Sequence, residues 1–272
     1  DRVSPMYIPM AICNMAAGNI AIDLGIRGES ECIVTACASG THSIGEALRL
    51  IRHGYQDAML CGGCEASITP SGIAGFTTIK ALNTTDDKTR ASIPFDKERS
   101  GFVMGEGAGV LVLEELEHAK ARGAKIYAEV VGYGASSDAY HITSPAPEGE
   151  GGKRAMINAL KDAKINPEDI TYINTHGTST PLNDKCETQA IKGAFSNCYD
   201  KLYVSSTKGH TGHLLGAAGA IEAIACVKAI EKSIIPPTIG YKVKDEDCDL
   251  NIVPNKPIKH EVEYAMSNSL GF

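Results

Sequence analysis

The apolar and polar positions in the first third of this chain of 272 residues change from a strand-like to a helix-like pattern. A short apolar segment of β type leads to Cys37 in a turn of small residues, and from Ala38 onward the apolar positions recur at helical spacing. These positions are Ile44, Ala47, Leu48 and Ile51. The pattern predicts a strand-to-helix corner with Cys37 in the turn.

Two later segments repeat the order of a β-type run followed by polar residues. A run at 170–173 is followed by His176 in a polar turn, and another short run leads through Lys208 to His213, after which a helix rich in small residues begins. Open α/β sheets place reactive groups in the crevice beyond the carboxyl ends of their strands. If the three strands share a sheet, we expect these side chains to converge on Cys37.

The stretch between these blocks predicts further strands and helices. A strand-like run at 126–138 precedes a loop rich in glycine and proline and then a helix around 153–163. Asn166 and Pro167 should close this helix, because proline cannot continue the helical ladder. This order predicts βαβ units around a parallel or mixed sheet.

Composition is close to that of a globular α/β enzyme, with 43% hydrophobic and 22% charged residues. No charge-free apolar stretch reaches the ~18 residues of a transmembrane helix. The net charge of −7 and the lack of a basic stripe argue against nucleic acid as a partner. Nine irregularly spaced cysteines predict no disulfide framework and indicate a reducing compartment, the cytoplasm or an organelle. The motif formed by Cys61 and Cys64 has no second pair for zinc.

Cys37 is the candidate nucleophile. Near the unpaired amides and the positive dipole end of a helix, a cysteine pKa can fall well below ~8.5, so that the thiolate becomes reactive. The alternative is a small buried residue in a strand-to-helix corner. His176 and His213 have a similar alternative, since a histidine in a turn is often only a hydrogen-bonded polar side chain.

Four segments resemble the signature blocks of β-ketoacyl-[acyl-carrier-protein] synthases of the elongating type II class. They are TACASG at 35–40, SGFVMGEGAG at 100–109, THGTSTPLND at 175–184 and STKGHTGHLLGAAG at 206–219. The resemblance runs in order along essentially the whole chain. It implies a thiolase-like α/β fold with α-β-α-β-α layers, in which residues 1–122 belong to one βαβαβ half and residues 123–272 to the other, and it implies a homodimer.

The resemblance also implies that this chain is part of a longer protein. It begins about a third of the way into the family's pattern, and a glycine-rich loop should continue beyond Phe272. We therefore expect the first half to be incomplete and to expose strand edges that the intact protein pairs.

The activity that the resemblance implies is a decarboxylative Claisen condensation, which lengthens an acyl chain by two carbons in fatty acid biosynthesis. Cys37 would take up the acyl group, and its amide together with that of Phe272 would hold the oxyanion. His176 and His213, as neutral imidazoles, would donate hydrogen bonds to the enolate formed from the malonyl group. Substrates would arrive on the phosphopantetheine of an acyl carrier protein, without a metal or other cofactor.

Further residues take supporting roles through the same resemblance. Lys208 would supply positive potential, with Glu222 as its ion-pair partner. Phe76 and Phe272 would line the acyl channel, and Lys80 would dock the acidic carrier protein.

Some positions depart from the family pattern or have two possible roles. Asp184 and Glu187 could order the loop after His176 or bind a structural cation. Ser100 replaces the usual aspartate, and His210 adds a third imidazole that we expect to point away from the site.

Other functions are compatible with the same residues. Ketosynthases of polyketide pathways carry the same blocks, and non-catalytic chain-length-determining homologues share the fold but typically lack the cysteine. Thiolases and starter-type synthases also share the fold, and the starter type pairs the cysteine with one histidine and one asparagine. A hydrolytic zinc site built from Cys37, His176 and His213 is a further alternative, because all three are good zinc ligands.

Overall fold

The computed structural model describes residues 2–271 and contains helices and strands in alternation. The helices are α1 (Tyr7–Ala11), α2 (Met15–Leu24), α3 (Ser39–Arg52), α4 (Pro70–Thr78), α5 (Leu116–Ala121), α6 (Glu150–Ala163), α7 (Pro181–Ala194), α8 (Lys208–Thr211) and α9 (Ala218–Lys232). The strands are β1 (Ala58–Glu65), β2 (Gly107–Glu114), β3 (Ile170–Asn174), β4 (Tyr203–Ser205), β5 (Ile234–Ile235), β6 (Ile258–Lys259) and β7 (Tyr264–Ser267). Short 3-10 turns include η3 (Pro167–Asp169) and η4 (Leu215–Ala217).

A parallel sheet with the order β4-β3-β7 forms the centre of the second half. Neighbouring side chains of β3 point to opposite faces of this sheet. Ile173 packs in the cluster that includes residues of α6 and α7, whereas Tyr172 packs against residues of α9. Both faces of the sheet are therefore covered by helices, as parallel strands require.

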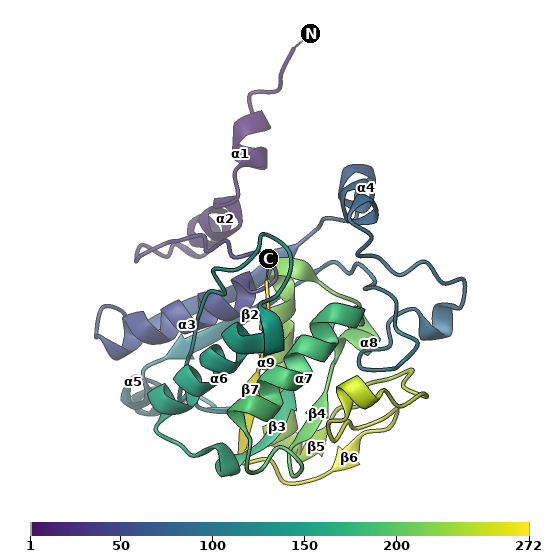
Figure 1. Cartoon of the computed structure of the whole chain (residues 1–272). Coiled ribbons are helices and arrows are strands. Elements are labelled where there is room, and N and C mark those ends of the chain that lie inside the picture. The colour runs from purple at the N-terminus through teal and green to yellow at the C-terminus, as the bar shows by residue number, and fades with distance from the viewer. Residues whose placement is uncertain (1, 272) are drawn as a thin grey trace.

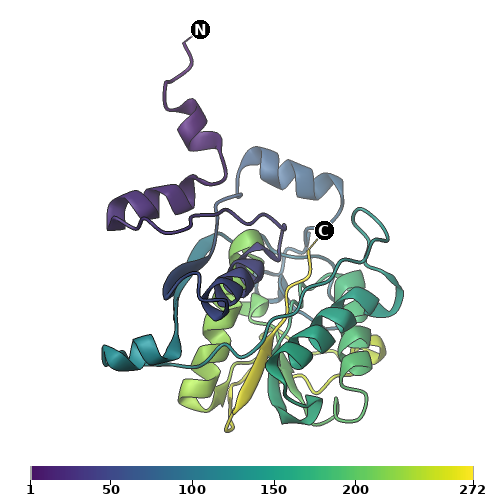
Figure 2. The same cartoon turned by 90° about the vertical axis from the view of Figure 1, so that its left-hand side faces the viewer.

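Helix α9 separates the two main sheets (Figures 1 and 2). It packs on β1 and β2 on one side and on β3 and β7 on the other, and α3 runs beside it. With α6 and α7 on the far face of the parallel sheet, the layers alternate between helix and sheet, which confirms the predicted layered α/β fold. The outer face of the antiparallel pair β1-β2 carries the exposed side chains Val110 and Val112.

Three local predictions were wrong. The runs at 126–138 and 32–36 form no described strand, because a strand exists only through a ladder with a neighbour; Thr35 makes only an isolated bridge. The helix predicted around 153–163 is present as α6, but Asn166 and Pro167 do not close it; Lys164 closes it in a left-handed conformation (φ 57°). Pro167 instead begins η3.

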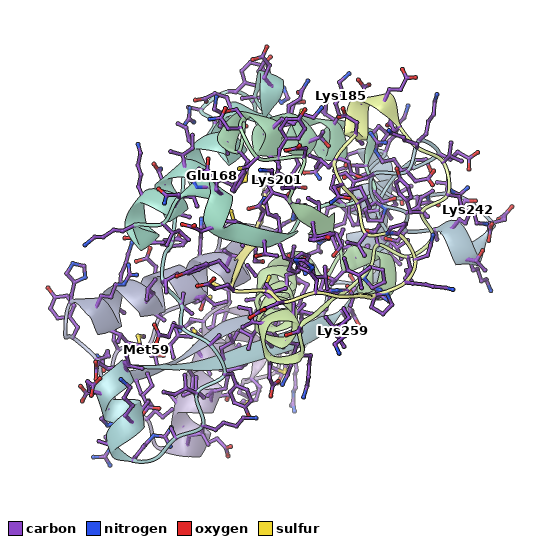
Figure 3. The ribbon with its side chains drawn as sticks, turned by 90° about the horizontal axis from the view of Figure 1, so that it is seen from below. Met59, Glu168, Lys185, Lys201, Lys242 and Lys259 are labelled. Atoms are coloured by element: carbon purple, nitrogen blue, oxygen red, sulfur yellow. The ribbon has the colours of Figure 1, made fainter. Side chains whose placement is uncertain are left out.

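Basic side chains are spread over separate elements. Figure 3 labels Lys185 on α7, Lys259 on β6, and Lys201 and Lys242 on two loops. Lys185 forms an ion pair with Asp247 at 2.9 Å. The described helices include none that is long and apolar enough to cross a membrane.

Candidate active site

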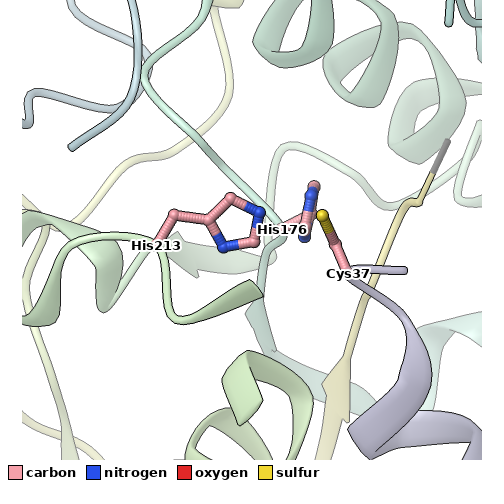
Figure 4. Close-up of side chains that lie close together, drawn as sticks. All are labelled: Cys37, His176 and His213. Atoms are coloured by element: carbon pink, nitrogen blue, oxygen red, sulfur yellow. The ribbon is translucent and has the colours of Figure 1, made fainter. Parts of the chain in front are cut away.

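Cys37 lies in a sharp turn just before α3. The preceding residue, Ala36, has a φ of 49°, a left-handed conformation that is unfavourable for a residue with a Cβ. The Ser39 hydroxyl stabilises the turn, because it accepts a hydrogen bond from the Thr35 amide (2.9 Å) and donates one to the Ala36 carbonyl (2.7 Å). Figure 4 shows the Cys37 sulfur beside the two histidine rings.

His176 and His213 meet because β3 and β4 are parallel neighbours. His176 follows β3 by two residues, and the chain that leaves β4 passes through α8 to His213. Carboxyl ends of parallel strands lie at the same edge of a sheet. The Cys37 sulfur and one nitrogen of each ring lie within 4.8 Å of one another, and the rings are edge to face with centroids 5.1 Å apart. The predicted convergence of these three side chains is present.

Fixed hydrogen-bond donors face Nδ1 of both imidazoles. Lys208 Nζ lies 3.4 Å from His176 Nδ1 and also donates to the His176 carbonyl at 2.5 Å. The Leu215 amide donates to His213 Nδ1 at 3.3 Å. A neutral imidazole that accepts at Nδ1 carries its proton on Nε2. Each ring therefore presents an Nε2–H group as a donor.

Burial keeps both rings uncharged. Desolvation, followed by the charge of Lys208, holds the pKa of His176 and of His213 well below the usual 6.5. The site thus offers two neutral N–H donors throughout the neutral pH range.

The low pKa predicted for Cys37 is wrong. Burial raises the pKa of this thiol from 9.0 to about 11, which outweighs the lowering effects of Lys208 and of the Cys37 amide, while Glu222 and Glu65 raise it further. The sulfur is buried against Phe102 and Leu215. The free-energy cost of burying a charged thiolate there exceeds the stabilisation that the nearby helix end provides. The resting site holds a protonated thiol beside two neutral imidazoles.

Glu65 is a charged neighbour of Cys37 that the sequence did not indicate. It is the last residue of β1, and its carboxylate accepts a hydrogen bond from the Gly216 amide at 3.3 Å. Gly216 follows Leu215, whose amide holds His213 and whose side chain packs against Cys37. Glu65 therefore acts on the site both by charge and by holding this turn.

We expect Glu65→Gln to increase the rate at which iodoacetamide alkylates Cys37 at pH 8 by about threefold. Removing the negative charge lowers the thiol pKa, while the glutamine oxygen can still accept the Gly216 amide. Below the pKa the thiolate fraction increases with pH, so the alkylation rates of both proteins should rise between pH 7 and 10. The curve of rate against pH should lie at lower pH for Glu65→Gln than for the wild-type protein. Mass spectrometry of the Cys37 peptide measures both rates. A curve for Glu65→Gln that lies at higher pH than the wild-type curve would contradict this role for Glu65.

Lys208 and Glu222 form the predicted ion pair, and both side chains are almost fully buried. Desolvation raises the pKa of Glu222 to about 7, although the Lys208 ammonium opposes this effect. Lys208 Nζ thus contacts both its carboxylate partner and His176.

Two buried carboxylates of α7 order the turn that follows His176. Glu187 accepts hydrogen bonds from the amide of His176 (2.8 Å) and of the next residue (2.7 Å). Asp184 accepts them from the amides of Thr178 (3.0 Å) and Phe95 (2.8 Å). Of the two roles considered for these acids, the contacts show the first, the ordering of the loop.

We expect Asp184→Ala to lower the free energy of unfolding by about 3–5 kcal/mol. The change leaves the amides of Thr178 and Phe95 without an acceptor and removes the carboxylate that lies 3.5 Å from the buried Arg99 guanidinium. Urea unfolding measures the loss. Asp247→Ala is the matched control, because it breaks only the exposed pair with Lys185 and should cost at most about 1 kcal/mol. Equal losses in the two variants would contradict the assigned contacts.

An apolar cluster surrounds the sulfur. Phe76 on α4 packs edge-on against Phe102 with ring centroids 5.2 Å apart, and Phe102 packs edge-on against His213 at 5.3 Å. Phe76 and Phe102 belong to one hydrophobic cluster with Cys37 and Leu215. Phe76 therefore lies in the apolar surroundings of the Cys37 sulfur.

The remaining candidates lie at the rim or outside the described residues. Lys80 is exposed, just after α4, and lines the same cavity as Cys37. Phe272 lies outside the described residues. The preceding Gly271 is close to the nucleophile, since a Cβ on it would be 3.5 Å from the Cys37 nitrogen. His210 is exposed and contacts the Pro237 carbonyl at 3.2 Å, so it does point away.

The surroundings of Cys37, His176 and His213 do not fit a zinc ion, although these residue types are metal ligands. A metal-bound histidine offers a nitrogen lone pair and donates its other N–H to an acceptor. Here Nδ1 of each ring accepts, so Nε2 carries the proton, and the Lys208 ammonium stands beside His176. The thiol is also protonated. The arrangement suits an anion that receives hydrogen bonds.

Sequence comparison identifies relatives along the whole chain. The N-terminal domain of β-ketoacyl synthases matches residues 1–119, and the C-terminal domain matches residues 127–242. The chain is 57% identical over 271 residues to 3-oxoacyl-[acyl-carrier-protein] synthase 2 of Staphylococcus aureus and 56% identical over 273 residues to the protein of that name from Synechocystis. All of this chain is covered, and it spans 67% and 66% of those two proteins.

Solved structures of similar shape are ketosynthases. One is a ketosynthase bound to the hexaketide, in complex with a type II PKS acyl-carrier protein (TM-score 0.97, 39% identity, 99% of this chain and 67% of that one). Another is the ishigamide ketosynthase/chain length factor (TM-score 0.93, 42% identity, 99% and 65%). With the strained cysteine turn and the two histidines at adjacent strand ends, these similarities show that the chain belongs to the β-ketoacyl synthase family.

Proposed function

We propose that this chain carries the catalytic centre of an acyltransferase that condenses an enzyme-bound acyl group with malonyl-acyl-carrier protein in fatty acid biosynthesis. The observation that carries the proposal is one buried sulfur facing two neutral Nε2–H donors. The relatives named 3-oxoacyl-[acyl-carrier-protein] synthase 2 support it. Because the chain spans about two thirds of their length, the activity is proposed for the intact protein.

In the first half-reaction the Cys37 sulfur attacks the carbonyl of the acyl thioester. The oxyanion that forms accepts a hydrogen bond from the Cys37 amide, with the Phe272 amide as the second donor that the resemblance implies. The positive end of α3 and the Lys208 ammonium favour the sulfur anion as it forms. When the carbon–sulfur bond to the carrier breaks, the carrier thiol leaves with the proton that Cys37 gave up.

In the second half-reaction the malonyl group loses CO₂, and the electron pair of the broken C–C bond forms an enolate. His176 and His213 donate Nε2–H hydrogen bonds to the enolate oxygen, where negative charge develops. The carbanion then attacks the acyl carbon on Cys37, the bond to sulfur breaks, and the departing thiolate takes up one proton from solvent. The product is a β-ketoacyl chain two carbons longer. Lys208 acts as a positioning residue through His176.

Substrates reach the site on the phosphopantetheine of an acyl carrier protein, and no metal or other cofactor takes part. One solved relative is a ketosynthase in complex with an acyl-carrier protein. Lys80, exposed at the rim of the cavity, is our proposed contact for the acidic carrier. Phe76 and Phe272 are the proposed lining of the acyl channel.

We expect Lys80→Glu to raise the KM for acyl-carrier protein about tenfold, because the reversed charge repels an acidic partner. The rate with an acyl-pantetheine thioester, which lacks the carrier protein, should stay unchanged. Lys201→Glu, on the loop before β4, is the control and should affect neither rate. Steady-state kinetics with both substrates checks this, and an equal loss with the small thioester would contradict a docking role.

The proposal also covers the organisation of the intact protein and its cellular compartment. Residues 1–122 and 123–272 belong to the two thiolase-like halves, and the intact protein is a homodimer. The nine cysteines form no disulfide, which supports a reducing compartment, and we assign the protein to the cytoplasm.

The proposed activity is tested by incubating the intact protein with an acyl-carrier protein and malonyl-carrier protein and measuring the chain on the carrier. We expect one β-ketoacyl product two carbons longer than the starting acyl group, with one CO₂ released per product. Repeated extension of unreduced keto groups would instead indicate a polyketide ketosynthase, such as the solved relative that holds a hexaketide. No product would indicate a non-catalytic homologue and contradict the proposal.

A further inference from the structure

The C-x-x-C motif is divided between the two faces of β1. Cys61 and Cys64 are three residues apart, so their side chains point in opposite directions from the strand. Cys61 is buried against Ile44 and Leu48 of α3 and is hydrogen-bonded to the Leu111 carbonyl at 3.8 Å. Cys64 is exposed. The two residues can therefore neither chelate one ion together nor form a disulfide.

Cys64 instead belongs to a group of exposed thiols with Cys13 and Cys32, which we call the thiol cluster. Cys13 lies between α1 and α2, and Cys32 lies five residues before Cys37. Figures 1 and 2 show α1 and α2 standing apart from the layered body of the protein. Desolvation, followed by hydrogen bonding with Cys13 and the charges of Cys13 and Cys64, raises the pKa of Cys32.

Within the thiol cluster, Cys13 and Cys32 are in direct contact. The Cys32 sulfur lies 3.2 Å from the Cys13 carbonyl oxygen. The thiol of Cys32 is also within hydrogen-bond reach of the Cys13 thiol. Because both side chains are exposed, a small rotation about their Cα–Cβ bonds brings the two sulfur atoms to bonding distance.

We propose that Cys13 and Cys32 form a reversible disulfide when a peroxide is present. One thiol attacks the O–O bond of the peroxide and becomes a sulfenic acid, with release of one water. The second thiol attacks this sulfur, the S–O bond breaks, and a second water leaves as the disulfide forms. Hydrogen peroxide thus takes two electrons from the two thiols. A small thiol restores both cysteines by exchange.

The disulfide would close a loop through α2, and Cys32 is near the start of the turn that holds Cys37. Cys37 itself is buried and its pKa is raised to about 11, so it is a poor competitor for the peroxide. The raised pKa of Cys32 means that the pair should oxidise faster as the pH increases.

Peptide mapping of the intact protein tests this proposal without reference to its activity. The protein is treated with hydrogen peroxide, blocked with iodoacetamide and digested with trypsin without reductant. Trypsin leaves Cys13 in peptide 3–27, Cys32 in peptide 28–49 together with Cys37, and Cys64 in peptide 53–80. We expect peptides 3–27 and 28–49 to become the main linked species, lighter by two hydrogen atoms than their sum and separated again by dithiothreitol.

Matched variants identify the sulfur atoms in the link. It should persist in Cys37→Ala and Cys64→Ser and be absent from Cys13→Ser and Cys32→Ser. Full alkylation of both peptides after peroxide treatment would overturn the proposal. A link that contains peptide 53–80, or one that survives in Cys32→Ser and is lost in Cys37→Ala, would overturn it as well.

Discussion

Replacing Cys37 by alanine is expected to abolish transfer of the acyl group to the protein, a loss of at least about 10³-fold in overall condensation. The substitution removes the sulfur that lies close to the two Nε2–H donors, and the turn from Thr35 to Ser39 keeps its two Ser39 hydrogen bonds. Intact-mass spectrometry after incubation with an acyl-carrier protein measures the adduct directly.

Cys61→Ala is the matched control for this experiment. Cys61 is also a buried cysteine, but it belongs to a separate hydrophobic cluster, against Ile44 and Leu48 of α3. Its loss should reduce stability and leave acyl uptake intact. If the Cys37→Ala protein still acquired the acyl group, the nucleophile would have to be another residue.

Replacing His213 by alanine is expected to slow decarboxylation of malonyl-carrier protein by about 10²–10³-fold, the usual cost of removing one oxyanion donor. Acylation of Cys37 should continue at close to the wild-type rate, because the Nε2–H group serves the enolate in the second half-reaction. The release of CO₂ and the acyl-enzyme mass measure the two steps separately. His176→Ala should separate them in the same way.

His213→Gln is the matched variant, since its amide N–H can reach the region of the lost Nε2–H donor. It should recover part of the decarboxylation that the alanine variant loses, whereas a role limited to packing against Phe102 would not depend on an N–H group. Equal loss of acylation and decarboxylation in His213→Ala would contradict the division of roles.

Much of the site could be predicted from local sequence. Cys37 precedes a clear helical period, and His176 and His213 follow short β-type runs. The parallel pairing of β3 and β4 then brings the two histidines to the same edge of the sheet. The run at 126–138 was misjudged because β-type composition does not supply a neighbouring strand.

What the sequence could not supply depends on distant contacts. The raised pKa of Cys37 reflects burial against Phe102 and Leu215, which no local pattern reveals. Glu65 holds Gly216 across 151 positions of the chain. The Nε2–H form of the two imidazoles likewise depends on the donors Lys208 and Leu215 that face their Nδ1 atoms.

A pulse and chase followed by intact-mass spectrometry tests the central claim most directly. The intact protein is first loaded from an acyl-carrier protein, the adduct is located by peptide mapping, and malonyl-carrier protein is then added. We predict that the acyl mass resides on Cys37 and disappears in the chase as a β-ketoacyl carrier two carbons longer appears, while the His213→Ala protein keeps its adduct. An adduct on another residue, or a Cys37 adduct that survives the chase in the wild-type protein, would contradict the account.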